Sequence, residues 1–234
     1  ACGHAAWESD SGLRCLGLEG IGSVSRLVVS VGEQLGSVSE AVSYDDVAVS
    51  SLVHANAPVT GDTELTLFGA RFGVDDYSGR AGVGGTQCGA TLWVDDSSAV
   101  CRVLAGVKGT SSTRLSVAAS VGQLTRALSY DSAAVSTVST TNLAGLQRTV
   151  TATGAGFGLA GYSPAARLQA SACGRSMWVS ETSVSCGGGD GGVGGSQGVT
   201  VSVGVQSGTT TLVLSYDAPL VSSALALNVP TTGK

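Results

Sequence analysis

One block of residues recurs three times in this chain and constrains its fold more than any other feature. The block holds two cysteines thirteen positions apart, with a tryptophan five positions after the first cysteine. Its three copies are Cys2-Trp7-Cys15, Cys88-Trp93-Cys101 and Cys173-Trp178-Cys186, which follow one another after 86 and 85 residues. A fixed period of this size indicates a chain built from duplicated structural units.

Two further motifs keep the same period. A Ser-Tyr-Asp tripeptide stands at residues 43–45, 129–131 and 215–217, and a Gly-x-x-Phe-Gly motif stands at residues 69–73 and 154–158. The motifs divide the chain into four predicted segments. These are the C-terminal half of a repeat (1–44), two complete repeats (45–130 and 131–216), and the first strand of a further repeat or a donor strand (217–234).

The six cysteines form three equally spaced pairs, which predicts three disulfides. These are Cys2–Cys15, Cys88–Cys101 and Cys173–Cys186. In the chain-entropy model, a bridge that closes such an interval stabilises a small module by about 3 kcal/mol. A zinc site would need four ligands, whereas each unit offers two cysteines and no recurring histidine, so we predict no metal. Persistent disulfides place the protein in an extracellular or cell-surface setting.

The hydrophobic period of the chain is two. The alternating apolar positions of two runs are Leu115, Val117, Ala119 and Val121, and then Val199, Val201, Val203 and Val205. This pattern predicts strands with one buried face. Each run ends near a glycine and leads into a second run that ends at the tripeptide tyrosine, which predicts a hairpin. The expected core aromatics are Trp7, Trp93, Trp178, Tyr44, Tyr130, Tyr216, Phe72 and Phe157.

In this order the motifs resemble the IPT/TIG family of immunoglobulin-like domains. The segments that carry the resemblance are Thr63–Gly73, Cys88–Cys101, Arg114–Gly122 and Leu128–Tyr130, with a second set from Thr149 to Tyr216. The block around each tryptophan looks like the tandem arrays of large extracellular proteins in algae and protists. The resemblance implies an all-β fold of tandem immunoglobulin-like sandwiches, with about 86 residues per repeat. Family membership does not fix function.

Composition argues against several classes of protein. Charged residues make up 12% of the chain and the net charge is −5, with no cluster of Arg or Lys, so we predict no nucleic-acid partner. No run of eighteen apolar residues occurs, so we predict no membrane span. The two histidines, His4 and His54, do not recur between units, and no nucleophile motif is present. We therefore predict no enzyme activity and no cofactor.

Three acidic pairs and one glycine-rich run are further candidate sites. Asp45-Asp46 stands at a repeat junction, where calcium between domains would need several converging oxygens. Its counterparts, Asp131-Ser132 and Asp217-Ala218, lack the second acid, so we interpret these pairs as acids in turns. Residues 187–195 lack the lysine of a phosphate loop and predict a loop between strands.

These features predict a non-catalytic extracellular structural protein, a repeat unit of a filament or cell-surface appendage. The alternative is an adhesion or ligand-binding array that uses the loops around Tyr77 and Tyr162. The sequence lacks an initiator Met and stops within a repeat, so we expect a mature, processed or partial chain. Either it is a stretch of a longer array, with neighbouring repeats of the same chain as partners, or a strand of one subunit completes the half repeat of the next, in head-to-tail self-association. O-linked glycans on the Ser/Thr-rich face are expected partners.

Overall fold

A computed structural model describes residues 2–17, 20–22, 24–140, 142–143, 149–188, 195–218 and 220–223. In these ranges every regular element is a β-strand. Correspondingly, the described part of the chain holds no helix long and apolar enough to cross a membrane. The chain divides into two compact units, Ala1–Ser132 with Gly204–Gln206, and Ala133–Val203 with Ser207–Lys234. Each unit is described by itself.

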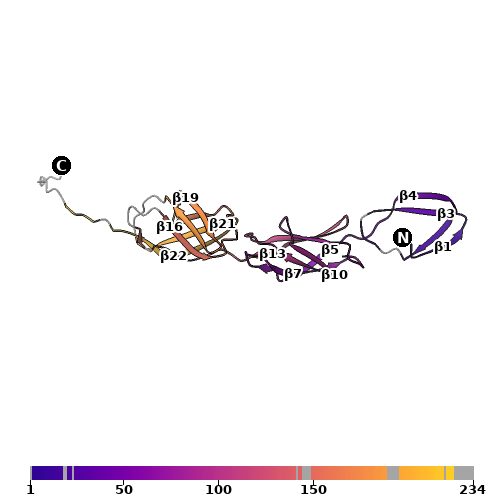
Figure 1. Ribbon diagram of the computed structural model, residues 1–234, viewed down its shortest axis with the longest axis horizontal. Helices are drawn as coiled ribbons and strands as arrows, with labels where there is room; N and C mark the ends of the chain where they lie inside the picture. The colour runs from indigo at the N-terminus through magenta and orange to yellow at the C-terminus, as the bar shows by residue number, and fades with distance from the viewer. Residues whose placement is uncertain are drawn as a thin grey trace, which may run out of the picture. The chain divides into compact units, whose positions relative to one another are not determined.

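The first complete repeat is a sandwich of two sheets (Figure 1). One sheet has the order β10-β11-β7-β5 and the other β6-β13-β12-β8-β9. All neighbours pair antiparallel except β6 and β13, which are parallel. The strands are β5 (Ala48–Val53), β6 (Asn56–Ala57), β7 (Thr63–Ala70), β8 (Arg80–Val83), β9 (Thr86–Gln87), β10 (Ala90–Asp95), β11 (Ser98–Val103), β12 (Ser111–Val117) and β13 (Ser120–Tyr130).

The second complete repeat has the same strand order. Its sheets run β14-β16-β20-β19 and β15-β22-β21-β17-β18, and β15 is again parallel to the last strand. The strands are β14 (Ala134–Val138), β15 (Asn142–Leu143), β16 (Thr149–Ala155), β17 (Ala165–Leu168), β18 (Ser171–Ala172), β19 (Arg175–Ser180), β20 (Ser183–Gly187), β21 (Gln197–Val203) and β22 (Gln206–Tyr216). The predicted all-β fold of tandem immunoglobulin-like sandwiches is confirmed.

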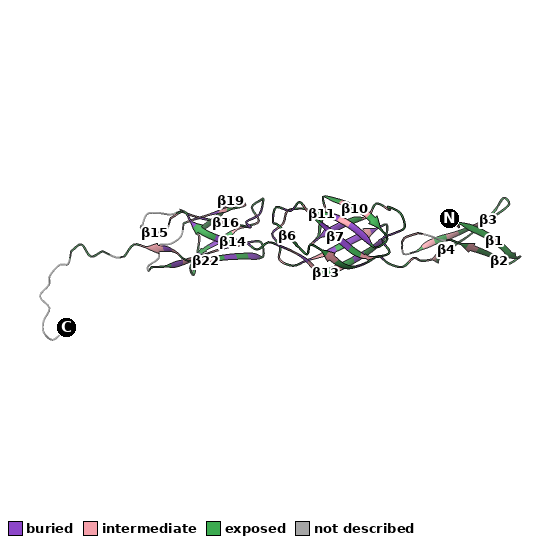
Figure 2. Ribbon diagram, turned by 90° about the horizontal axis from the view of Figure 1, so that it is seen from below, coloured by how far each residue is buried: buried purple, intermediate pink, exposed green. Residues whose placement is uncertain are grey.

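The core of each sandwich follows the period of two. In β12 and β21 every second residue is buried, and the buried apolar positions are Leu115 and Val117, then Val199, Val201 and Val203. On the facing sheet Leu65 and Leu67 of β7 are fully buried, and Figure 2 shows the colour of buried residues in the strands of this sandwich. Burial of each such side chain contributes about 1.5–3 kcal/mol relative to exposure.

The Gly-x-x-Phe-Gly motif closes one end of each core. A Cβ on Gly69 would lie 1.9 Å from the carbonyl oxygen of Ala48, and one on Gly154 would lie 1.8 Å from that of Ala134. Only glycine allows the two strands to approach so closely. The chain then turns inward, and both Phe72 and Phe157 have no exposed surface, as predicted for residues that plug the core.

The half repeat contains two separate two-stranded sheets, β1 (His4–Ser9) with β2 (Gly12–Leu16), and β3 (Ser25–Val31) with β4 (Gln34–Val42). The prediction that Trp7 is a core residue is wrong, because its side chain is 73% exposed. Among the described residues no further strands extend these sheets, and Figure 2 shows β1 and β2 mostly in the colour of exposed residues. A two-stranded sheet buries little on either face.

The hairpins turn earlier than the alternation predicted. The strand expected to continue through Ala119 and Val121 ends at Val117, and a turn at Ala118-Ala119 leads into β13. In the second repeat the turn is Gly204-Val205, and Val205 is 80% exposed. The first turn residue has a positive φ in both, 50° at Ala118 and 58° at Gly204. Apolar residues in a two-residue turn preserve the alternation and thus hide the turn in the sequence.

The predicted boundaries of the four segments stay predictions. Within the last segment, Asp217, Ala218 and residues 220–223 form no strand, and the remainder of the predicted donor strand lies outside the described residues.

Candidate functional site

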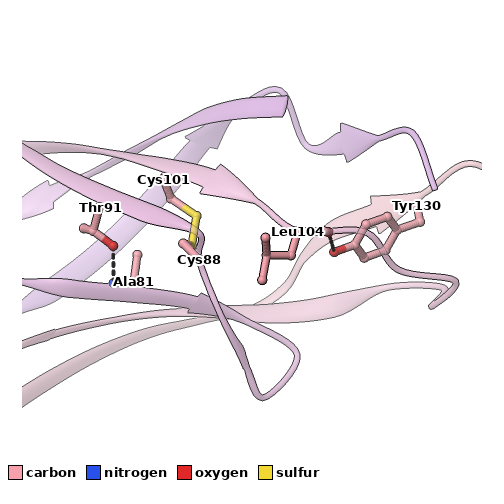
Figure 3. Close-up of a disulfide and its surroundings, with 6 residues drawn as sticks. All are labelled: Ala81, Cys88, Thr91, Cys101, Leu104 and Tyr130. Carbon is pink, nitrogen blue, oxygen red and sulfur yellow. Dashed lines mark hydrogen bonds between the residues drawn. A yellow bond between two sulfur atoms is a disulfide. The ribbon is translucent and has the colours of Figure 1, made fainter. Parts of the chain in front are cut away.

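In each complete repeat the disulfide lies where the chain crosses from one sheet to the other. Cys88 follows β9, and its N–H donates to the carbonyl oxygen of Ala81 in β8. The next residue, Gly89, donates to the carbonyl oxygen of Arg102 in the opposite sheet. Cys88 is bonded to Cys101 of β11, which has no exposed surface (Figure 3). The bridge therefore ties the crossover to a central strand.

The other two predicted pairs are also bonded. Cys173 is joined to Cys186, and its N–H donates to the carbonyl oxygen of Ala166, as Cys88 donates to Ala81. In the half repeat Cys2 is joined to Cys15. The Cα atoms of the three pairs are 5.5–5.8 Å apart. This separation is typical of disulfides, so all three cysteine pairs named from the sequence are brought together.

A hydroxyl group beside each disulfide connects the two sheets. The Ala81 N–H of β8 donates to Thr91 Oγ1 of β10 at 2.9 Å (Figure 3). In the second repeat the Ala166 N–H donates to Ser176 Oγ at 2.8 Å. A partly buried backbone N–H needs a hydrogen-bond acceptor, and here a hydroxyl side chain of the opposite sheet provides it.

The tryptophans that follow these hydroxyl residues are half-buried, and their indole groups differ. Trp178 Nε1 donates to the carbonyl oxygen of Gly158 at 3.1 Å. Trp93 Nε1 is buried without a hydrogen-bond acceptor among the described residues. The predicted core role of Trp93 and Trp178 thus corresponds to a position at the margin of the core.

The tripeptide tyrosine packs against a glycine. Tyr130 is buried, and its hydroxyl donates to the carbonyl oxygen of Leu104 at 2.9 Å (Figure 3). A Cβ on Gly106 would lie 2.7 Å from the Tyr130 ring, and Gly20 has the same relation to Tyr44, which is half-buried. Tyr216 of the second repeat is also half-buried.

The cavity beside Tyr130 and the disulfide is very small. Its volume is about 10 Å³, and Cys88, Leu104 and Tyr130 are among its walls. A cavity needs about 10–15 Å³ to hold a single water molecule. This region is therefore a packed structural centre without room for an organic ligand.

The serine and aspartate of the tripeptide hold one asparagine between them. In the first complete repeat Ser129 Oγ donates to Asn56 Oδ1 at 2.8 Å, and Asn56 Nδ2 donates to Asp131 Oδ1 at 2.6 Å. Backbone bonds from the Ser129 N–H to Ala55 O and from the Asp131 N–H to Ala57 O flank them, both at 2.9 Å. We call this arrangement the asparagine clamp; it fastens the parallel pair of β6 and β13.

The asparagine clamp is repeated in the second repeat. Ser215 Oγ donates to Asn142 Oδ1 at 3.1 Å, and Asn142 Nδ2 donates to Asp217 Oδ1 at 2.5 Å. Asn142 pairs with Ser215 in the parallel ladder, as Asn56 pairs with Ser129. The tripeptide thus combines a tyrosine that packs on the domain with two polar side chains that hold the first strand of its own repeat.

Substitution of Asn56 by alanine is expected to loosen one repeat only. The variant loses two side-chain hydrogen bonds, one to a carboxylate, which amounts to about 1–2 kcal/mol at this exposed site. Hydrogen exchange of the full chain should become faster at 56–57 and 129–131 and stay unchanged at 142–143 and 215–217. Asn142→Ala should show the reverse, and His54→Ala, at an exposed neighbour, should change neither. Equal exchange in Asn56→Ala and the wild type would contradict a stabilising clamp.

The acidic pairs bond to backbone and side-chain groups nearby. Asp95 Oδ1 accepts from Ser97 Oγ at 2.8 Å and from the Ser97 N–H at 2.7 Å, and these bonds lower the pKa of Asp95, the hydroxyl bond most. Asp96 Oδ1 accepts from the Gly73 N–H, and Asp76 Oδ1 from the Ser78 N–H. The contacts of Asp95 and Asp76 are those of acids in turns, whereas Asp96 accepts from a residue 23 positions earlier in the chain.

Two arginines lie beside further carboxylates. Arg71 Nε is 3.5 Å from Asp45 Oδ2, and its Nη1 donates to the carbonyl oxygen of Asp46 at 3.1 Å. At Asp62, a hydrogen bond and the positive charge of Arg102 lower the pKa of the carboxyl group. Among the described residues no three His, Cys, Asp or Glu side chains converge as metal ligands would.

The remaining candidates do not gather into one site. His4 and His54 are both exposed and stand on different elements, in β1 and after β5. Tyr77 and Tyr162 are half-buried, and the Tyr77 ring lies over Gly73, where a Cβ would be 2.5 Å from it. Most of the glycine-rich run at 187–195 lies outside the described residues.

Three features of the site were missed in the sequence. These are the asparagine clamp, the inter-sheet hydroxyl and the glycine under the tyrosine. The repeat period is the sequence feature that could have revealed them, because each residue recurs at that spacing. The spacing is 86 residues for Asn56 and Asn142, 85 for Thr91 and Ser176, and 86 for Gly20 and Gly106. None of these residue types is unusual alone, so only the period could have singled them out.

Some solved structures are similar to the chain at low identity. The extracellular region of plexin A4 is 17% identical over 74% of this chain and 18% of its own, with a TM-score of 0.36. A surface glycan-binding protein from Prevotella bryantii is 12% identical over 73% of this chain and 43% of its own, with a TM-score of 0.47. The I9-I11 tandem of titin is 10% identical over 83% of this chain and 75% of its own, with a TM-score of 0.31. The chain thus spans less than a fifth of the plexin region.

Sequence comparison identifies one repeat directly. No curated protein matches the chain. The model of the IPT/TIG domain family matches residues 48–131. This segment runs from the first residue of β5 to the aspartate of the asparagine clamp, and the second repeat has the same strand order. Residues 48–131 of this chain are therefore an IPT/TIG domain, a member of that immunoglobulin-like family.

Proposed function

We propose that this chain is a non-catalytic extracellular structural protein, a repeat building block of a filament or cell-surface appendage made of end-to-end sandwiches. The observation that carries the proposal is the repetition of structural devices. The disulfide at the sheet crossover, the inter-sheet hydroxyl and the asparagine clamp all occur in both complete repeats. The recurring features are therefore those that stabilise each unit, and an extended array of similar modules requires stable units.

The disulfides support the extracellular part of the proposal. Each of the two sandwiches and the half repeat has one bridge, and the described residues contain no free cysteine. Such bridges persist in oxidising compartments and are rare in the cytosol. A bridge in every unit suits a protein whose modules must each withstand conditions outside the cell.

An extracellular adhesion or ligand-binding array is the second candidate. The observation that favours it is a loop with one constant and several variable positions. The half-buried Tyr77 and Tyr162 take equivalent places, whereas Asp75-Asp76 of the first loop corresponds to Ala160-Gly161 of the second. Loops of different sequence on a constant scaffold are the usual place for specific binding.

Negative-stain electron microscopy of the native, unfractionated material tests the first candidate. We expect filaments with a regular axial repeat. Dispersed short rods would overturn the filament proposal. In that case a glycan and protein binding screen of the wild type and of Tyr77→Ala and Tyr162→Ala tests the second candidate, and binding lost in either variant would support it.

A further inference from the structure

The outer face of the five-stranded sheet in the first complete repeat is positively charged and has no carboxylate. This sheet has the order β6-β13-β12-β8-β9, and every strand of it lies within the described residues. The charged side chains of its strands are all arginines, and all are exposed: Arg80 in β8, Arg114 in β12 and Arg126 in β13. The chain as a whole has a net charge of −5, so this face is a local exception to the overall negative charge.

Strand pairing brings these arginines together, although the sequence separates them. Arg114 pairs with Gly82 in β8, and Arg80 stands two positions before Gly82, so Arg80 and Arg114 are diagonal neighbours. Such neighbours lie about 7–8 Å apart on one face of a sheet, within reach of a single extended ligand. Arg126 lies in the bulge of β13, which interrupts the pairing beside Ser112, two positions before Arg114.

The guanidinium groups of this face have no partner in the described part of the chain. The ion pairs found there use three other arginines, which are Arg14, Arg71 and Arg102. A Cβ on Gly82 would lie 3.4 Å from Arg114 Nε, so the missing side chain of Gly82 gives the Arg114 guanidinium room against the sheet. The hydrogen-bond donors of the face are therefore available to a ligand.

The fold does not require these arginines. At the equivalent places the second repeat has Ala165, Thr200 and Leu212, and its sheet has the same strand order. Arg167 is the single charged residue in the described strands of that sheet. The positive face is thus a property of one repeat, and the packing of the sandwich does not explain it.

Amide side chains stand on both sides of Arg114 in the same row of the sheet. Gln87 of β9 pairs with Gly82, and Gln123 of β13 pairs with Arg114. Both glutamines are exposed, and an amide group can donate to and accept from sugar hydroxyls. A guanidinium forms charge-assisted hydrogen bonds to anionic oxygens. The row therefore offers partners for both the hydroxyl and the acidic groups of a charged sugar chain.

We propose that this face binds a linear acidic polysaccharide through its carboxylate or sulfate groups. We call the surface formed by Arg80, Arg114, Arg126, Gln87 and Gln123 the arginine face. Its charge complements a polyanion, and an exposed sheet suits an extended chain. This inference rests on the extracellular part of the proposed function and gives the array a binding partner in its surroundings.

The residues of the sheet favour a polysaccharide over a nucleic acid. Single-stranded nucleic acids bind to exposed aromatic side chains on which their bases stack, in addition to phosphate contacts. The single aromatic residue in the strands of this sheet is Tyr130, and it is buried. The arginine face thus has charge and amide groups but no surface for stacking bases.

Isothermal titration calorimetry of the full chain at low ionic strength tests the proposal. The probes are heparin as a sulfated polysaccharide, polygalacturonate as a carboxylated one, and dextran as a neutral one. We expect at least one of the two acidic polysaccharides to bind, with an affinity that falls as salt is added, and dextran not to bind.

A pair of double variants assigns the binding to the arginine face. Arg80→Ala with Arg114→Thr introduces the residues of the second repeat and should bind about tenfold more weakly. Arg167→Ala with Arg175→Ala is the matched control, because it removes the same charge from exposed positions of the second repeat and should leave the affinity unchanged. Hydrogen exchange in β8 and β12 should stay as in the wild type, which separates a lost contact from a misfolded repeat.

Three outcomes would overturn the proposal. They are no binding of either acidic polysaccharide, an equal loss of affinity in the two double variants, and tighter binding of a single-stranded DNA oligonucleotide or of polyglutamate than of both polysaccharides. The second outcome would show attraction to net charge alone, and the third would assign the face to another class of polyanion. None of them bears on filament formation, which electron microscopy of the native material decides separately.

Discussion

Replacement of Phe72 by alanine is expected to lower the unfolding free energy of the first complete repeat by about 3–5 kcal/mol. Phe72 has no exposed surface, and its ring lies against Gly69, whose missing Cβ leaves room for the carbonyl oxygen of Ala48 in β5. Its N–H donates to the carbonyl oxygen of Asp96 at 2.9 Å, which holds the backbone in place. The truncated side chain therefore leaves a cavity that the surrounding strands cannot fill.

Urea unfolding of the full chain, with hydrogen exchange as the readout for each repeat, measures this effect. The control is Phe68→Ala on β7, whose side chain is 39% exposed and should contribute less than about 1 kcal/mol. Phe157→Ala should destabilise the second repeat in the same way, because Phe157 also has no exposed surface. A loss at Phe72 no larger than at Phe68 would show that the Gly-x-x-Phe-Gly motif does not close the core.

Removal of the Cys88–Cys101 bridge is expected to lower the unfolding free energy of the same repeat by about 2–5 kcal/mol. The double variant Cys88→Ala and Cys101→Ala loses the link between the sheet crossover and β11. Chain entropy accounts for about 3 kcal/mol of this effect, because the unbridged unfolded chain has more conformations. Loss of the buried Cys101 sulfur adds a packing cost.

Differential scanning calorimetry of the full chain checks the second prediction. The variant should show one transition at a lower temperature, and reduction of the wild type should reproduce that shift. The matched control, Cys2→Ala with Cys15→Ala, removes the bridge of the half repeat and should leave the transitions of the complete repeats in place. If both double variants melt like the wild type, the bridges are not what stabilises the units.

The features that the sequence predicted are those encoded by periodicity and local chemistry. The disulfide pairs follow from three equal cysteine intervals, and the burial of Leu115 and Val117 follows from an alternation that places every second side chain on one face. The closing role of Phe72 could be inferred because glycines on both sides permit a sharp bend. The turn at Ala118-Ala119 could not, since small apolar residues continue the pattern of the strand.

The sequence by itself determined the repeat, the strand period and the disulfide pairs, because each depends on spacing along the chain. Only the tertiary structure decided which distant residues meet. Asn56 reaches Ser129 and Asp131 across more than seventy residues, through a parallel pairing that no local pattern records. It also decided that Trp7 is exposed while Phe72 is buried, since burial depends on the strands that surround a residue and not on its own type.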